Sequence, residues 1–229
     1  MHPIRRPRVK ICCIAGIEEA QLAIACGASA IGLVSEMPSG PGPIPEERIA
    51  VIARTIPPGV ASFLLTCRQD TGSIVDQQRR VRTNTLQLVD TVSIDTYREL
   101  RAALPGIAIV QVVHVTGDSA IQIASRFASH VDAILLDSGN PQLAVKQLGG
   151  TGRRHDWTIS RRIREAVNIP IFLAGGLNAG NVREAIETVG PFALDVCSGV
   201  RTNGKLDKRK LSEFMEAAHD VRSNWTGTS

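Results

Sequence analysis

The chain contains 229 residues with a formal net charge of +4 at pH 7, and its 43% hydrophobic residues include few aromatic ones. No apolar run reaches the ~20 residues that a membrane-spanning helix needs, and no run of signal-peptide type follows the basic start. We therefore expect a cytoplasmic protein with no membrane partner. Its short basic clusters lack interleaved aromatic residues, so the sequence gives no support for nucleic-acid binding.

The cysteines argue against a disulfide framework and against a structural zinc site. There are five of them, an odd number, and no C-x-x-C pair is present. A cytoplasmic setting would also keep thiols reduced. We expect no metal site.

Eight short β-branched runs alternate with segments of helical spacing. The runs begin near Arg8, Ala28, Gly59, Thr85, Ile107, Asp132, Ile169 and Phe192. Helices are predicted over residues 18–26, 45–54, 71–82, 94–104, 118–129, 158–167, 181–188 and 207–222, and the pattern over 71–82 is the weakest. This alternation predicts parallel strands that are joined by right-handed crossovers.

Eight strand–helix units favour an α/β fold of the (β/α)8 TIM-barrel type, with eight parallel strands, over an open doubly wound sheet of five or six strands. The open sheet is the structural alternative, but no Gly-x-Gly-x-x-Gly follows the first strand as a dinucleotide site would require. Short linkers predict a single domain over residues 1–229, with flexible ends at 1–7 and 223–229. The loop over residues 35–45, rich in proline and glycine, follows the second strand on the side where barrel active sites form.

Polar residues at the carboxyl ends of barrel strands are the candidates for chemistry. Lys10 and Cys12 end the first strand, and strand alternation predicts that they share a side while Cys13 faces the other. Asp137 follows an apolar run at the end of the sixth strand, where its pKa would be raised, and Asp195 lies in the eighth. The plainer interpretations make Cys12 a small buried hydrophobe and Asp137 a capping or ion-paired residue.

Three glycine-rich stretches follow the sixth, seventh and eighth predicted strands. Backbone N–H groups can approach a phosphate closely where glycine lines the loop, and barrels often hold phosphate at strands seven and eight. Glycine turns without any ligand are also common. The predicted phosphate-binding residues are Gly149, Gly150, Thr151, Gly152, Gly175, Gly176, Ser198 and Gly199.

Over nearly its whole length, the sequence resembles the phosphoribosylanthranilate isomerase family of tryptophan biosynthesis. The resemblance rests on VKIC at 9–12, LLD at 135–137, GGTG at 149–152, FLAGGL at 172–177 and DVCSGV at 195–200. It implies a TIM barrel that performs an Amadori rearrangement, in which a phosphorylated aminoaldose becomes an aminoketose. It further implies Cys12 as general base at ribose C2′, Asp137 as general acid at the ring oxygen, and Lys10 and Asp195 in support.

The same resemblance implies no cofactor, a small phosphorylated sugar as the binding partner, and either a monomer or a homodimer. Four positions depart from the family pattern: Gly42 replaces an arginine, Val89 a histidine, Cys13 a glycine and Cys67 an asparagine. The arginine is expected to pair with the anthranilate carboxylate, a contact worth about 1.5–3 kcal/mol. Three hypotheses are therefore open: phosphoribosylanthranilate isomerase, a paralogue with a different aglycone, and a non-catalytic protein that binds phosphorylated ligands.

Overall fold

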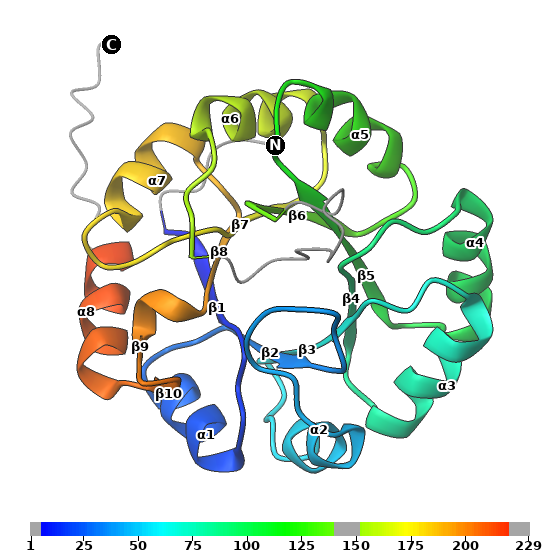
Figure 1. Cartoon of the computed structure of the whole chain (residues 1–229), viewed down its shortest axis with the longest axis horizontal. Coiled ribbons are helices and arrows are strands. Elements are labelled where there is room, and N and C mark those ends of the chain that lie inside the picture. The colour runs from blue at the N-terminus through cyan, green and yellow to red at the C-terminus, as the bar shows by residue number, and fades with distance from the viewer. Residues whose placement is uncertain (1–5, 140–151, 220–229) are drawn as a thin grey trace.

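Eight parallel strands close into a barrel in chain order, in a computed structural model that describes residues 6–139 and 152–219 (Figure 1). The first strand pairs with the last, with Lys10 opposite Asp195 and Ile11 opposite Val196. The strands are β1 (Arg8–Ile11), β2 (Ala30–Val34), β3 (Ala61–Thr66), β4 (Thr85–Leu88), β5 (Ala108–His114), β6 (Ala133–Asp137), β7 (Ile171–Leu173) and β8 (Ala193–Val196). The predicted TIM barrel is confirmed, and the open-sheet alternative is excluded.

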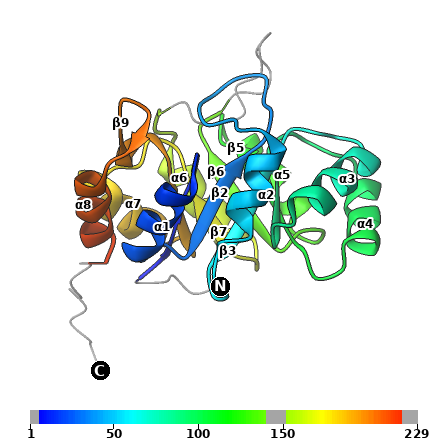
Figure 2. The same cartoon turned by 90° about the horizontal axis from the view of Figure 1, so that it is seen from below.

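Helices surround the barrel as an outer ring (Figure 1). They are α1 (Ile17–Ala25), α2 (Glu46–Ala53), α3 (Thr71–Val81), α4 (Ile94–Ala103), α5 (Ser119–Phe127), α6 (Trp157–Ala166), α7 (Val182–Val189) and α8 (Lys208–His219). After β8 come the 3-10 turn η1 (Ser198–Val200) and a small hairpin of β9 (Arg201–Thr202) and β10 (Lys205–Leu206). Figure 2 shows the loop between β2 and α2 standing above one end of the barrel.

The helix with the weakest sequence pattern, α3, has an N-cap and a buried face that contains polar side chains. The Asp70 carboxylate accepts a hydrogen bond from the backbone N–H of Ser73 at 2.9 Å, an N-cap contact worth about 1 kcal/mol. Its buried face includes Gln77 and Gln78 as well as aliphatic residues. Those two glutamines break the apolar stripe by which an amphipathic helix is recognised in sequence.

Two apolar layers stabilise the barrel. The larger lies between the strands and the helices, and the smaller fills the barrel interior with side chains such as Phe63, Leu65, Val112 and Leu135. A buried ion pair also lies among the interior side chains, with 2.9 Å between Lys10 Nζ and Asp195 Oδ1. Burial lowers the pKa of Lys10, but the negative charge and the hydrogen bond of Asp195 outweigh it and raise that pKa above its usual range.

Candidate active site

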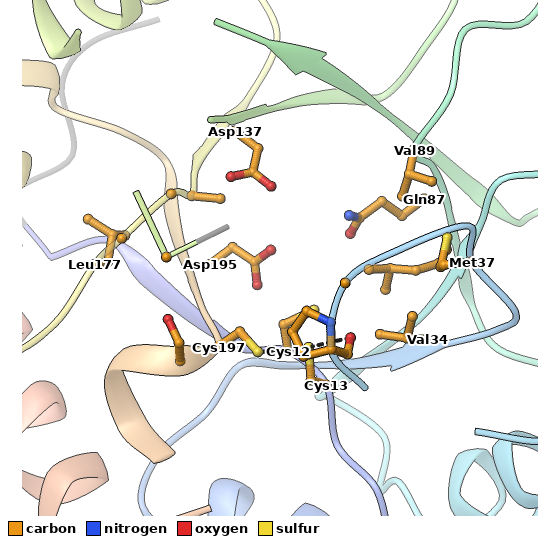
Figure 3. A pocket seen from close by; sticks show the side chains of 18 of the residues that line it. Cys12, Cys13, Val34, Met37, Gln87, Val89, Asp137, Leu177, Asp195 and Cys197 are labelled. Carbon is orange, nitrogen blue, oxygen red and sulfur yellow. Dashed lines mark hydrogen bonds between the residues drawn. The ribbon is translucent and has the colours of Figure 1, made fainter. Parts of the chain in front are cut away.

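One cavity at the carboxyl ends of the strands brings together most of the predicted site residues. Its lining includes Cys12 from the end of β1, Asp137 from the end of β6 and Asp195 from β8 (Figure 3). Of the predicted phosphate-binding residues, Gly152, Gly175, Gly176 and Ser198 also line the cavity. Two other predicted residues, Lys10 and Gly199, are not among its lining residues. Gly149, Gly150 and Thr151 lie outside the described residues.

Cys12 lies just past the end of β1, where the backbone of β8 and the side chain of Arg201 hold it. Its N–H donates to the carbonyl of Val196 at 2.9 Å, and its own carbonyl accepts from Arg201 Nη2 at 3.1 Å. Cys12 as a residue is 6% exposed. Its thiol lies against Gly32, where a Cβ atom would come within 2.9 Å of the Cys12 Sγ and 3.0 Å of the Lys10 Nζ. The thiol and the ammonium group therefore lie side by side, with Lys10 deeper in the barrel.

Asp137 is 8% exposed at the end of β6, and its Oδ1 accepts a hydrogen bond from the N–H of Ser138 at 2.7 Å. Burial raises the pKa of this carboxyl, although the Ser138 N–H and the neighbouring His114 oppose the shift. Burial in turn lowers the pKa of His114, which pairs with Asp137 in the β5–β6 register. The proton is thus held on the carboxyl to a higher pH than on a free aspartic acid.

The loops after β6, β7 and β8 meet so closely that they leave no room for side chains. Gly152, Gly175 and Gly176 have φ values of +66°, +87° and +66°, in the left-handed region that favours glycine. A Cβ atom on Gly176 would lie 2.9 Å from the carbonyl oxygen of Gly152, and one on Gly199 would lie 1.9 Å from the carbonyl oxygen of Leu177. These contacts assemble the glycine-lined wall of the cavity.

Gly199→Ala should therefore lower the free energy of unfolding by about 1–3 kcal/mol, because the added methyl group overlaps the backbone of the loop after β7. Urea unfolding measures the change. Gly117→Ala is the matched control, since a Cβ atom there would meet no atom within 4 Å. Equal losses in the two variants would contradict the close approach of these loops.

A family model described as N-(5'phosphoribosyl)anthranilate (PRA) isomerase matches residues 9–217. The chain belongs to this family. The isomerase of Methanocella arvoryzae is 37% identical over 210 residues, which cover 91% of this chain and 96% of that protein. Isomerase 2 of Methanosarcina mazei is 37% identical over 213 residues, with coverages of 92% and 93%. The predicted family and enzyme class are confirmed.

Solved structures of family members share the fold. The isomerase from Thermotoga maritima superposes with a TM-score of 0.79 at 31% identity, covering 93% of this chain and 98% of that one. A phosphoribosylanthranilate isomerase in complex with reduced 1-(o-carboxyphenylamino)-1-deoxyribulose 5-phosphate gives a TM-score of 0.77 at 30% identity, with the same coverages. In the part of this chain that the structure describes, no helix combines the length and apolarity needed to cross a bilayer.

One prediction about the isomerase site was wrong: Cys13 does not face away from Cys12, and both line the cavity. Strand alternation applies only to extended backbone, and β1 ends at Ile11. Cys13 has a φ of +61°, which turns its side chain toward the loop after β2. There its Sγ lies 3.6 Å from the carbonyl oxygen of Pro41.

Cys13 and Gly42, two of the expected departures from the isomerase family pattern, are in direct contact, which indicates a structural exchange between the two positions. A Cβ atom on Gly42 would lie 2.6 Å from the Cβ of Cys13, so the cysteine occupies the space that a side chain at position 42 would need. Val89 lines the same cavity, whereas Cys67 lies in a neighbouring pocket beside Arg68. Among the described residues, no lysine or arginine lines the cavity that holds Cys12 and Asp137.

This exchange predicts that the cost of a side chain at position 42 depends on Cys13. Gly42→Ala should lower the free energy of unfolding by about 2–4 kcal/mol, from overlap with Cys13 and from the strain of alanine at a φ of +90°. In a Cys13→Gly background only the strain is left, and the cost should fall to about 1–2 kcal/mol. Urea unfolding of wild type, the two single variants and the double variant gives the coupling free energy between the two positions. If the free-energy costs of the two substitutions simply added up, the exchange would be refuted.

Sequence reasoning missed Arg201, whose guanidinium group is hydrogen-bonded to the β1–α1 loop and to α1. Its Nη2 donates to the carbonyl of Cys13 at 2.6 Å, and its Nη1 donates to Glu19 Oε1 at 3.1 Å. Burial raises the pKa of Glu19, but the N–H groups of Leu206 and Ala15 and the charge of Arg201 outweigh it and lower that pKa. The only signal in the sequence was one arginine directly after the motif of the eighth strand.

Proposed function

We propose that this chain isomerises N-(5′-phosphoribosyl)anthranilate to 1-(o-carboxyphenylamino)-1-deoxyribulose 5-phosphate in tryptophan biosynthesis, with Cys12 as general base and Asp137 as general acid. The observation that carries the proposal is that a thiol and a carboxyl group from strands β1 and β6 line one cavity, whose further wall is made of glycine loops (Figure 3). Acid and base on separate strands can act on different atoms of one sugar.

Asp137 begins the proposed reaction by donating its proton to the furanose ring oxygen, and the C1′–O bond breaks as the aniline nitrogen forms a protonated imine. Burial supports this role, because it raises the pKa of Asp137 and keeps the proton available. The Cys12 thiolate then removes the proton from C2′. The resulting enol tautomerises to the ketone, so the reaction moves protons within one molecule and requires no oxidant or reductant.

The phosphate would be bound by the glycine-lined wall. Gly152, Gly175 and Gly176 line the cavity and would donate their backbone N–H groups to the anion, and the hydroxyl of Ser198 adds a further donor. The proposed set also includes Gly199, which packs against the carbonyl oxygen of Leu177. Gly149, Gly150 and Thr151 complete the proposed set from outside the described residues. Lys10 and Asp195 support the floor of the cavity beside Cys12.

Turnover tests the proposal directly. The purified chain should consume N-(5′-phosphoribosyl)anthranilate, followed as loss of anthranilate fluorescence, and should rescue a tryptophan auxotroph that lacks this isomerase. The double variant Cys12→Ala, Asp137→Asn sets the background rate. Turnover no faster than this background would refute the proposal, and tight binding of a reduced product analogue under those conditions would indicate a non-catalytic binding protein.

A different aglycone is the second candidate, favoured by the absence of lysine and arginine from the described lining of the cavity. The loss of a charge-assisted contact to the anthranilate carboxylate corresponds to roughly 10- to 100-fold in kcat/KM. The experiment compares phosphoribosylanthranilate with its aniline analogue, which lacks the carboxylate. Near-equal kcat/KM values and no rescue of the auxotroph would favour the paralogue, whereas a strong preference for the carboxylate would exclude it.

A further inference from the structure

Three cysteines from two neighbouring strands gather at one corner of the cavity. Cys12 and Cys13 follow β1, and Cys197 follows β8, which pairs with β1 along its whole length. All three line the same cavity (Figure 3). The Cys13 and Cys197 sulfur atoms lie 2.7 Å apart, although 184 positions separate the two residues in sequence. The proposed isomerisation uses Cys12 alone, so this second pair of thiols has no part in it.

The backbone of Cys13 has a conformational cost. Its φ of +61° lies in the left-handed region, which costs a non-glycine residue about 1–2 kcal/mol. That conformation is what brings its sulfur to Cys197. Arg201 holds the strained turn in place by donating to the carbonyls of both Cys12 and Cys13. The loop thus holds the Cys13 thiol against that of Cys197.

The two thiols differ in the way that an attacking and a resolving cysteine differ. A hydrogen bond with Cys13 and the positive charge of Arg201 lower the pKa of Cys197, although burial opposes them. Hydrogen bonds to Cys12 and Cys197, together with burial, raise the pKa of Cys13. Cys197 is also the more exposed of the two. A low-pKa thiol beside a second thiol is the arrangement found at reversible oxidation sites.

We propose that Cys13 and Cys197 form a reversible disulfide on exposure to peroxide, which makes this corner of the cavity an oxidation site. The Cys197 thiolate attacks a peroxide oxygen, so an S–O bond forms and the O–O bond breaks, and the departing hydroxide takes a proton to become water. The Cys13 sulfur then attacks the sulfenic sulfur of Cys197. The S–S bond forms, the S–O bond breaks, and the second water leaves with the Cys13 proton. One peroxide is reduced to two waters.

Bond formation would shorten the sulfur–sulfur distance from 2.7 Å to about 2.05 Å and would tie the β1–α1 loop to the end of β8. Cys12 is the neighbour of Cys13 in the chain, so the displacement acts directly on the proposed base. Small misplacements of reacting groups lower turnover strongly, and we expect a loss of at least about tenfold that dithiothreitol restores. Formation of the disulfide does not depend on the proposed isomerisation. Only the expected effect of the disulfide on turnover rests on the proposed function.

The test is peptide mapping of the full chain after treatment with hydrogen peroxide. The protein should lose the mass of two hydrogen atoms, and proteolysis should give a cross-link between the segment with Cys13 and the segment with Cys197. The Cys12→Ala variant should keep this cross-link and Cys13→Ser should abolish it. No cross-link, or one that survives Cys13→Ser and disappears in Cys12→Ala, overturns the proposal.

Turnover gives the second readout, with each variant normalised to its own untreated rate. Wild type should lose activity with peroxide and recover it with dithiothreitol, and Cys197→Ser should lack this reversible loss. Cys26→Ser is the matched control, because Cys26 caps α1 outside the cavity and should leave the response unchanged. If Cys197→Ser showed the same reversible inactivation as wild type, the Cys13–Cys197 disulfide would not be the cause of the lost turnover, and this part of the proposal would be overturned.

Discussion

Replacement of Asp137 with asparagine should lower kcat for N-(5′-phosphoribosyl)anthranilate by about 10²- to 10⁴-fold, the usual contribution of a positioned general acid. Asparagine has nearly the same shape and keeps an oxygen to accept the N–H of Ser138, which donates at 2.7 Å. What the variant lacks is an acidic proton for the ring oxygen. We therefore expect KM to change little. Steady-state kinetics measure both constants, and a kcat within about twofold of wild type would contradict the role.

The same variant should be more stable than wild type at neutral pH. Burial raises the folded-state pKa of Asp137 above the unfolded value of about 3.9. The contribution of the protonated Asp137 carboxyl to the free energy of unfolding is therefore fully present below the unfolded pKa. Wild type loses this contribution as the pH rises through the folded pKa. Asparagine does not ionise, so the stability advantage of Asp137→Asn in urea unfolding should grow as the pH rises above the unfolded pKa of about 3.9. A difference that stays constant from below this pH to neutral pH would mean that burial does not shift the pKa of this carboxyl.

Much of this arrangement was predictable because it follows from periodicity and from the topology of parallel barrels. Each of the eight strands begins within two residues of its predicted start, since β-branched runs bounded by turns are a local signal. The convergence of Cys12 and Asp137 on one cavity follows from the rule that strand carboxyl ends meet at one face. Neither inference needs knowledge of a tertiary contact.

The parts that sequence reasoning missed depend on contacts between distant segments. The orientation of Cys13 could not be derived from alternation, because one left-handed residue ends the strand pattern. Its relation to Gly42 and to Cys197 exists only once the loop after β2 and the end of β8 lie against the β1–α1 loop. The role of Arg201 likewise depends on the β9–β10 hairpin, in which Arg201 is the first residue, packing against the β1–α1 loop.

Replacement of Cys12 with serine should lower kcat by about 10²- to 10⁴-fold, because a hydroxyl is far too weakly acidic to be present as an anion that removes the C2′ proton. Serine is close in size, so the 6% exposed site should keep its packing and its backbone hydrogen bond to Val196. Cys67→Ser is the matched control. That thiol lies in the neighbouring pocket and donates to the carbonyl of Glu36 at 3.3 Å, so its loss should change kcat by no more than about twofold.

Substrate deuterated at C2′ separates the two proposed roles. In Cys12→Ser, removal of the C2′ proton becomes the slowest step, so the primary isotope effect on kcat should exceed that of wild type. In Asp137→Asn, ring opening becomes the slowest step and the isotope effect should fall toward unity. The two variants would then shift the same observable in opposite directions. A fall in Cys12→Ser, or equal isotope effects in both variants, would mean that the thiol does not remove this proton, because loss of a positioning side chain alone would not select one chemical step.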